Sequence, residues 1–230
     1  MRKNSGKEPG ASWDGVVTSM VPRNGRPDRI AVYIDGSFAL EVDAGLAQGA
    51  GLRVGGVLTA EGQQALRDGD RPFLARARAL ALLAIRDRSS EELRMRLRRL
   101  GFAPETIDDV VAWLKDLGYL DDERFARSYA LEKTRSGWGD RRVRQELRRK
   151  GVDRGSVEGV LAERQADEEA VREQQEALQS QVRRRFGSEF RRDAVTAERR
   201  LTGFLLRRGY DWDSISRMVE MLRSEAEETP

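Results

Sequence analysis

The sequence predicts a mainly α protein in which tandem three-helix repeats form an elongated array, with a small β-rich module at the N-terminus. One observation is a recurrence: a leucine, a glycine four residues later and an apolar residue after it. The recurrence occurs at residues 97–102, 147–152 and 205–210, with the glycines 50 and then 58 residues apart. The other is composition, because only 39% of the residues are hydrophobic and 35% are charged. A lean core and a repeat of this length are typical of modular proteins whose units complete one another's cores.

The N-terminal part differs from the rest. Residues 1–12 are polar, and we expect a disordered tail there. Residues 13–70 are predicted to form the β-rich module. Asp35-Gly36 is typical of a two-residue hairpin turn, because glycine accepts positive φ, and Asn24-Gly25 marks an earlier turn. After the strands, the chain gives only a weak helix-turn-helix pattern. The predicted strands are 16–21, 29–34 and 37–42.

The first predicted repeat covers residues 72–118. We expect the helical part of the chain to begin at Pro72, and the composition of residues 73–86 favours a helix. Ser89 and Glu92 are spaced as a capping box at the start of the second helix. Gly101 should end that helix, since glycine tolerates the left-handed conformation. The third helix should run from Pro104 to Gly118 with a buried stripe of Ile107, Val110, Val111 and Leu114.

Repeats 2 and 3 are predicted at residues 119–166 and 167–228. Asp121 is a plausible cap for repeat 2, and Asp211 for the last helix of repeat 3. The first helix of repeat 3 is expected at about 167–186. Lys150 and Arg164 stand where repeat 1 has leucines. Repeat 2 should therefore have a smaller apolar core than repeat 1, unless the aliphatic parts of these two side chains lie along apolar surface.

Composition excludes several function classes. Cysteine and histidine are both absent, which rules out disulfides, thiol chemistry and imidazole catalysis. The glycine-rich stretch 49–56 lacks the order of a phosphate-binding loop. Asp121-Asp122-Glu123 and Asp108-Asp109 are better explained by helix capping than by a metal site. Carboxylate or lysine chemistry stays open on composition, but no motif assembles it, and an enzyme is only the third hypothesis. We therefore predict no enzymatic activity, no cofactor and no metal. No apolar run is long enough for a membrane helix and no secretory signal is visible, so we expect a cytoplasmic protein.

Positive charge concentrates in the middle of the chain. Residues 71–154 carry 21 basic and 14 acidic side chains. Aligning the second helices matches Arg94 with Arg144 and Arg98 with Arg148, one helical turn apart, and repeat 3 lacks this pair. Guanidinium groups at this spacing can hold successive phosphates or carboxylates. The predicted contact residues are Arg94, Arg98, Arg99, Arg141, Arg144, Arg148, Arg149 and Trp138.

Two simpler interpretations remain beside this one. The arginines could only keep an amphipathic helix soluble, without contacting any partner. Phe125 and Tyr129, which alternate with basic residues, could stack on bases but fit core packing better. Trp138 lies in a predicted loop between helices, and it is therefore the better candidate for an exposed contact.

Several motifs together resemble the RecX family, bacterial modulators of the RecA recombinase. They are Gly118-Tyr119-Leu120-Asp121-Asp122, Arg124-Phe125-Ala126 and Ser89-Ser90-Glu91-Glu92-Leu93 before Leu97. The resemblance covers about residues 72–228, and the family's helical core does not explain the first seventy residues.

The resemblance implies a regulator that docks along the RecA–single-stranded DNA filament. Such a protein would inhibit the filament's ATPase, strand-exchange and co-protease activities in DNA recombination, repair and the SOS response. The implied partners are the RecA filament and single-stranded, and also double-stranded, DNA, with the protein acting as a monomer. The alternative is a DNA-binding architectural or transcriptional protein that acts without RecA, because a basic stripe needs no specific protein partner.

Overall fold

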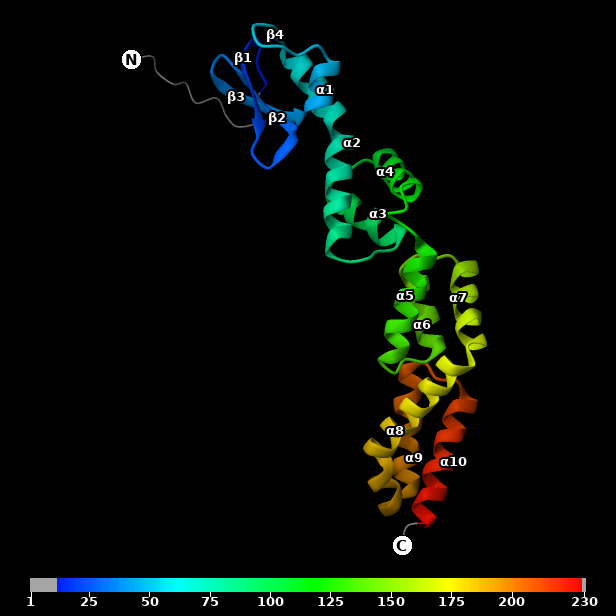
Figure 1. The fold of residues 1–230 in the computed structure, drawn as a ribbon. Coiled ribbons are helices and arrows are strands. Elements are labelled where there is room, and N and C mark those ends of the chain that lie inside the picture. Colours follow the sequence, from blue (N-terminus) through cyan, green and yellow to red (C-terminus); the bar gives the residue numbers. More distant parts are fainter. Residues whose placement is uncertain (1–11, 229–230) are drawn as a thin grey trace. The chain divides into compact units, whose positions relative to one another are not determined.

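The computed structural model describes residues 12–228, so the tail expected at 1–12 lies outside the described residues apart from Ser12. A small antiparallel sheet is followed by three helical repeats, which confirms the predicted mainly α class with a β-rich N-terminal module (Figure 1). The chain divides into two compact units. One contains the sheet and residues up to 84 together with 97–110, and the other contains residues 85–96 and those from 111 onward.

The predicted strands and turns are confirmed. β1 (Gly15–Arg23), β2 (Arg26–Ile34) and β3 (Ser37–Asp43) pair antiparallel, and β4 (Val57–Leu58) pairs with β1 in the order β3-β2-β1-β4. Asp35 and Gly36 both have positive φ, at 49° and 80°, as a tight hairpin requires. One face of the sheet buries Val32, Ile34 and Val42 against Ala47 of α1 (Ala44–Gly49) and Leu66 of α2 (Ala60–Ile85).

The prediction that helices begin at Pro72 is wrong. α2 begins at Ala60 and runs through Pro72 to Ile85. A proline inside a helix removes one backbone hydrogen bond and crowds the preceding turn, so from sequence alone it resembles a helix start. Tertiary packing outweighs this cost, because Leu66 before the proline and Ala75 and Ala79 after it are all buried.

A buried ion pair fastens α2 to the sheet on the N-terminal side of Pro72. Arg29 of β2 contacts Asp70 through Nη1–Oδ1 at 2.6 Å and Nη2–Oδ2 at 2.8 Å. The backbone N–H of Asp43 also donates to Asp70 Oδ1, at 2.8 Å. Burial lowers the pKa of Arg29, but the hydrogen bonds and charge of Asp70 outweigh it and hold the pKa above its ordinary value.

The second and third helices of repeat 1 have the ends that were predicted for them. Its second and third helices are α3 (Ser90–Arg99) and α4 (Pro104–Asp116). The Glu92 N–H donates to Ser89 Oγ at 3.1 Å and the Ser89 N–H donates to Glu92 Oε2 at 3.4 Å, which confirms the capping box. Gly101 is left-handed, with φ 80°. The predicted stripe on α4 is confirmed, because Ile107, Val110, Val111 and Leu114 are all buried.

Repeats 2 and 3 are each built around their own core. The helices are α5 (Asp122–Arg135), α6 (Asp140–Arg149) and α7 (Arg154–Ala166), then α8 (Glu168–Arg192), α9 (Ala194–Arg208) and α10 (Trp212–Glu228). Asp121 caps α5 by accepting from two backbone N–H groups, and Asp211 accepts from the Ser214 N–H at 2.8 Å, so both predicted caps are confirmed. α8 continues past its predicted end at Phe186, because Phe186 and Phe190 are both buried in the repeat 3 core.

Candidate partner and nucleic-acid interface

The arginines predicted to make contacts in repeat 2 lie on the outer side of α6. Val143 and Leu147 are fully buried in the core of the repeat, which turns the remaining positions of the helix towards its flanks and surface. Arg144 is half-buried, and the exposed members of the set are Arg141, Arg148 and Arg149. Their contact with a partner stays a prediction.

A carboxylate of the same repeat already pairs with two of these arginines. Glu158 of α7 lies 3.1 Å from Arg144 Nε and 2.8 Å from Arg148 Nη2. Desolvation would raise the pKa of Glu158, but the hydrogen bonds and charges of Arg144 and Arg148 hold it below its ordinary value. Arg149 is likewise paired with Glu146, at 2.6 Å. The stripe on α6 therefore carries less uncompensated charge than its arginine count indicates.

The corresponding arginines of repeat 1 follow the same sequence pattern. Arg94 is half-buried, Arg98 and Arg99 are exposed, and each takes part in an interaction within the protein. In the repeat alignment Asp108 takes the position of Glu158. Both repeats thus carry arginines on the second helix and a carboxylate on the third.

Trp138 differs from the exposed contact residue that was expected. Its ring is half-buried and packs on the core of repeat 2. The Arg142 guanidinium lies 3.8 Å from the ring centroid, and the Lys133 ammonium is 5.7 Å away. These contacts give Trp138 a packing role, because a base would have to displace Arg142 to stack on that face.

The packing interpretation of Phe125 and Tyr129 is confirmed. Phe125 is buried, Tyr129 is half-buried, and their rings stack with centroids 5.9 Å apart. Lys150 lies over this pair, with its ammonium 5.1 Å from the Tyr129 centroid. Its stem therefore covers the core at the position where repeat 1 has a leucine.

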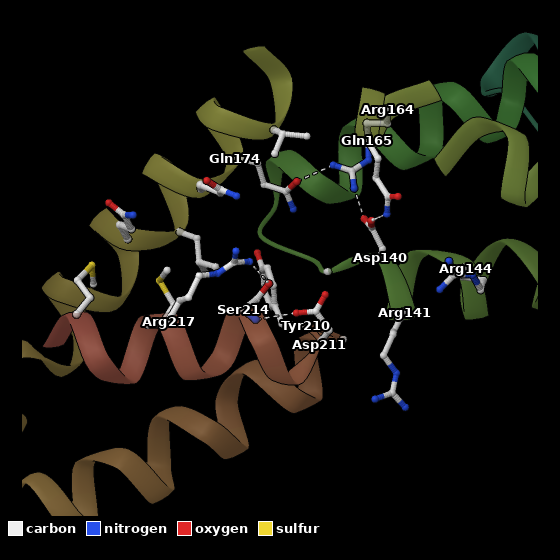
Figure 2. Close-up of a pocket in the computed structure, with 18 residues that line it drawn as sticks. Asp140, Arg141, Arg144, Arg164, Gln165, Gln174, Tyr210, Asp211, Ser214 and Arg217 are labelled. Carbon is white, nitrogen blue, oxygen red and sulfur yellow. Dashed lines mark hydrogen bonds and ion pairs between the residues drawn. The ribbon is translucent and has the colours of Figure 1, made fainter. Parts of the chain in front are cut away.

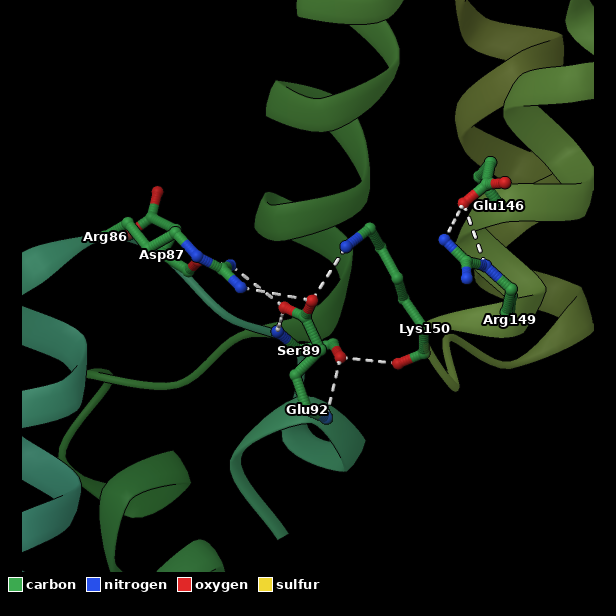
Figure 3. Close-up of polar contacts among 7 residues, drawn as sticks. All are labelled: Arg86, Asp87, Ser89, Glu92, Glu146, Arg149 and Lys150. Carbon is green, nitrogen blue, oxygen red and sulfur yellow. Dashed lines mark hydrogen bonds and ion pairs between the residues drawn. The ribbon is translucent and has the colours of Figure 1, made fainter. Parts of the chain in front are cut away.

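The same lysine joins repeat 2 to the start of α3 (Figure 3). Its ammonium contacts Glu92 Oε1 at 2.7 Å, and its carbonyl accepts from Ser89 Oγ at 2.5 Å. Arg86 contacts the other oxygen of Glu92 at 3.1 Å. Burial would raise the pKa of Glu92, but the hydrogen bonds of Arg86 and Lys150 outweigh it and lower the pKa to about 2.

Asp122 forms a second tie between these repeats. Its carboxylate accepts from the Ser90 N–H at 2.7 Å and from Ser90 Oγ at 2.6 Å. Lys115 Nζ lies 3.1 Å from the same carboxylate. Asp121 and Asp122 are thus helix-capping groups, as predicted. Within residues 12–228, no group of three or more acidic side chains is placed to hold a metal ion.

Repeat 3 meets repeat 2 end to end. The C-terminal carbonyls of α9 accept from the N-terminal amides of α6: Gly139 N–H to Arg208 O at 2.8 Å and Arg141 N–H to Gly209 O at 3.2 Å. Backbone N–H groups at the start of α6 and backbone carbonyls at the end of α9, which have no partner within their own helices, thereby satisfy one another. The positive end of the α6 dipole also meets the negative end of the α9 dipole. Ser89 and Lys150 are the sequence counterparts of Gly139 and Arg208, so both junctions use the same repeat positions.

A cleft of about 430 Å³ lies beside this second junction (Figure 2). Arg164 reaches across it, pairing with Asp140 and donating to Gln174 Oε1 at 2.6 Å. Tyr210 is only 6% exposed, and burial raises the pKa of its hydroxyl. Arg164, like Lys150, therefore joins two repeats at a position where repeat 1 has a leucine.

Repeat 3 also holds a basic surface that the sequence alignment revealed only in part. A groove of about 460 Å³ runs between α8 and α9, and we call it the basic groove. Its arginines occupy helix positions that differ from those of the aligned pair in repeats 1 and 2, and one comes from the first helix of the repeat. The repeat alignment matches only two of them with predicted contact residues, because Arg207 matches Arg99 and Arg149, and Arg199 matches Arg141. The four arginines of the basic groove are Arg185, Arg199, Arg200 and Arg207.

The three helical repeats have counterparts in a known family. Models of the first, second and third three-helix domains of RecX match residues 75–114, 121–161 and 172–219. The protein named regulatory protein RecX from Salmonella typhimurium is 37% identical over 166 residues, which cover 64% of this chain and 92% of that protein. This chain belongs to the RecX family. The matched RecX proteins are named regulatory proteins. Among residues 12–228 of this chain, no helix is long and apolar enough to cross a membrane.

The likeness to RecX extends beyond the helical repeats. A RecX from Clostridium acetobutylicum is 26% identical over 214 residues, covering 92% of this chain and 98% of its own. A crystal structure of regulatory protein RecX matches with a TM-score of 0.66 and 21% identity, over 90% of this chain and 98% of that one. The RecX structure from Lactobacillus salivarius matches with a TM-score of 0.55 and 22% identity, over 67% and 97%. Coverage of about nine-tenths of this chain includes most of the N-terminal module, which the helical core alone left unexplained.

Proposed function

We propose that this protein is a non-enzymatic regulator that binds the RecA–single-stranded DNA filament and inhibits its ATPase, strand-exchange and co-protease activities. The observation that carries the proposal is membership of the RecX family across all three helical repeats. Because the filament forms on chromosomal DNA, we place the protein in the cytoplasm.

The repeat junctions support a physical mechanism. Lys150 and Arg208 are equivalent residues, and each uses its carbonyl to join its repeat to the preceding one. Equivalent surfaces on successive repeats suit a partner that is itself built from repeated protomers. A protein that binds one filament geometry more tightly than another shifts the filament population towards it. Inhibition by this route needs no chemistry from the bound protein.

The decisive experiment is RecA ATPase on single-stranded DNA, with the full chain titrated at several salt concentrations. We expect hydrolysis by RecA to fall at substoichiometric to stoichiometric protein, and we expect no hydrolysis by the protein alone. Unchanged RecA activity at saturating protein would refute the proposal. If DNA binding persisted in that case, the RecA-independent DNA-binding alternative would be favoured.

A further inference from the structure

Part of the uncompensated positive charge of repeat 3 lies in the basic groove. Arg200 is paired there with Glu189, at 2.8 Å. Within the described residues, Arg185, Arg199 and Arg207 have no carboxylate within ion-pair distance. This differs from α6, where three of the four predicted arginines are paired with glutamates. Exposed cations without a nearby counter-charge attract an anionic partner more strongly than cations that are already paired.

The groove holds its arginines in defined places. The Arg185 guanidinium lies 4.7 Å from the Phe204 ring centroid, a cation–π contact. A Cβ on Gly203 would stand 3.3 Å from Arg207 Nη1, so the glycine leaves room for this guanidinium to lie along α9. Phe186 and Phe204 close the floor at 3% and 8% exposure. Arg185 and Arg207 are therefore partly ordered before any ligand arrives, which lowers the entropic cost of binding.

We propose that the basic groove binds the phosphate backbone of a nucleic acid strand. Arg199 and Arg207 are eight residues apart on α9, which is about 12 Å along a helix. That length matches three to four nucleotides at the spacing of about 3.4 Å that each strand has in duplex DNA. Arginine forks pair with phosphate oxygens through two hydrogen bonds. The buried phenylalanines offer no exposed ring to a base and no apolar core to a protein segment, so the contact is to the backbone and independent of base sequence.

The strand's path continues onto repeat 2. Arg207 also lines a second hollow, of about 450 Å³, together with Arg141 and Arg142 of α6. Arg141 is exposed and has no acidic partner within residues 12–228. The end-to-end junction of α9 and α6 therefore joins the basic groove to the one predicted arginine of α6 that is not paired. The inference deepens the proposed function and rests on it for the source of the strand, which is the DNA of the filament.

The test measures DNA binding in the absence of RecA. The full chain carrying Arg185→Gln, Arg199→Gln and Arg207→Gln would be titrated against a fluorescein-labelled 30-nucleotide oligo(dT) by anisotropy, at several salt concentrations. We expect affinity to fall on the order of 10- to 100-fold, because three charge-assisted contacts are lost. The slope of log affinity against log salt should become shallower by about 2, at roughly 0.7 per phosphate contact for a single strand.

The matched control is Arg172→Gln, Arg183→Gln and Arg223→Gln. These arginines also lie in repeat 3, but each is within ion-pair distance of a glutamate. The control should bind oligo(dT) nearly as the wild type does. Equal losses in both variants would reduce the effect to net charge and overturn the inference. Unchanged oligo(dT) binding by the groove variant, with loss of binding to poly-glutamate, would overturn it in favour of an acidic protein segment. Neither result depends on RecA, so the ATPase experiment judges the proposed function separately.

Discussion

Lys150 and Arg164 show how single residues join neighbouring repeats. Both stand where repeat 1 has a leucine, and Lys150 lies over the rings of Phe125 and Tyr129 in its own repeat. Their charged ends reach groups beyond it: Lys150 contacts Glu92, and Arg164 donates to Gln174. The lysine and the arginine remove some apolar volume from the core of repeat 2 but add polar contacts to the neighbouring repeats. Repeat 2, which has the smaller core, is therefore joined by polar contacts at both ends.

Gly151 offers a prediction at the residue scale. It is left-handed, with φ 78°, and an added Cβ would overlap the side chain of Glu91. Gly101 has nearly the same φ, 80°, but open space around it. Replacing Gly101 with Ala should cost about 1 kcal/mol, the backbone penalty alone. Replacing Gly151 with Ala should cost roughly 1–3 kcal/mol more, because side chains at the junction must move. Urea denaturation followed by circular dichroism measures both.

The position of Gly155 supplies a control within the same repeat. It lies in the first turn of α7 without a positive φ. Gly155→Val should therefore lower stability less than Gly151→Val does. Equal midpoints for this pair would mean that neither the left-handed geometry nor the junction contact limits stability.

At the scale of the helix, the distribution of carboxylates decides which arginines are available. α6 is rich in arginine, yet Glu158 of α7 holds two of its guanidinium groups and Glu146 holds a third. The middle of α9 has fewer arginines than α6, but Arg199 of α9 lines the basic groove and is not paired with a carboxylate. The helix with the denser stripe is therefore the more neutralised one.

Glu158→Gln tests this at the element scale. The change should release Arg144 and Arg148 from a charged partner and strengthen oligo(dT) binding by about two- to fivefold, since an exposed ion pair contributes roughly 0–1 kcal/mol. Glu163→Gln is the control, because Glu163 lies on the same helix and pairs with Arg127 instead. Fluorescence anisotropy at low salt compares the two variants. An equal gain from both would mean that only net charge matters.

At the scale of the molecule, stability against acid should depend on the junction between repeats 1 and 2. The pKa of Glu92 is lowered to about 2 from 4.5 by contacts that exist only in the folded chain. A lowered folded-state pKa stabilises the protein at pH values above 4.5, and this contribution is lost as pH falls towards 2. Glu92→Gln should therefore lower the melting temperature at pH 7 and flatten its decline between pH 5 and pH 2.

The comparison for this acid profile is Glu105→Gln, an exposed residue in the first turn of α4. Its profile should run nearly parallel to that of the wild type. Thermal denaturation by circular dichroism across this pH range checks both variants. Parallel profiles for Glu92→Gln and the wild type would show that the network in Figure 3 does not contribute to acid stability.

The sequence by itself determined the repeats, their helix ends and the hairpin of the N-terminal module. These features are local: left-handed glycines, the capping pair of Ser89 and Glu92, and apolar side chains at helical or strand spacing. Only the tertiary structure decided that α2 continues through Pro72, because the packing and the Arg29–Asp70 pair that hold it come from distant segments. It likewise decided which arginines are paired. Charge compensation depends on which side chains meet in space, and a one-dimensional alignment does not record that.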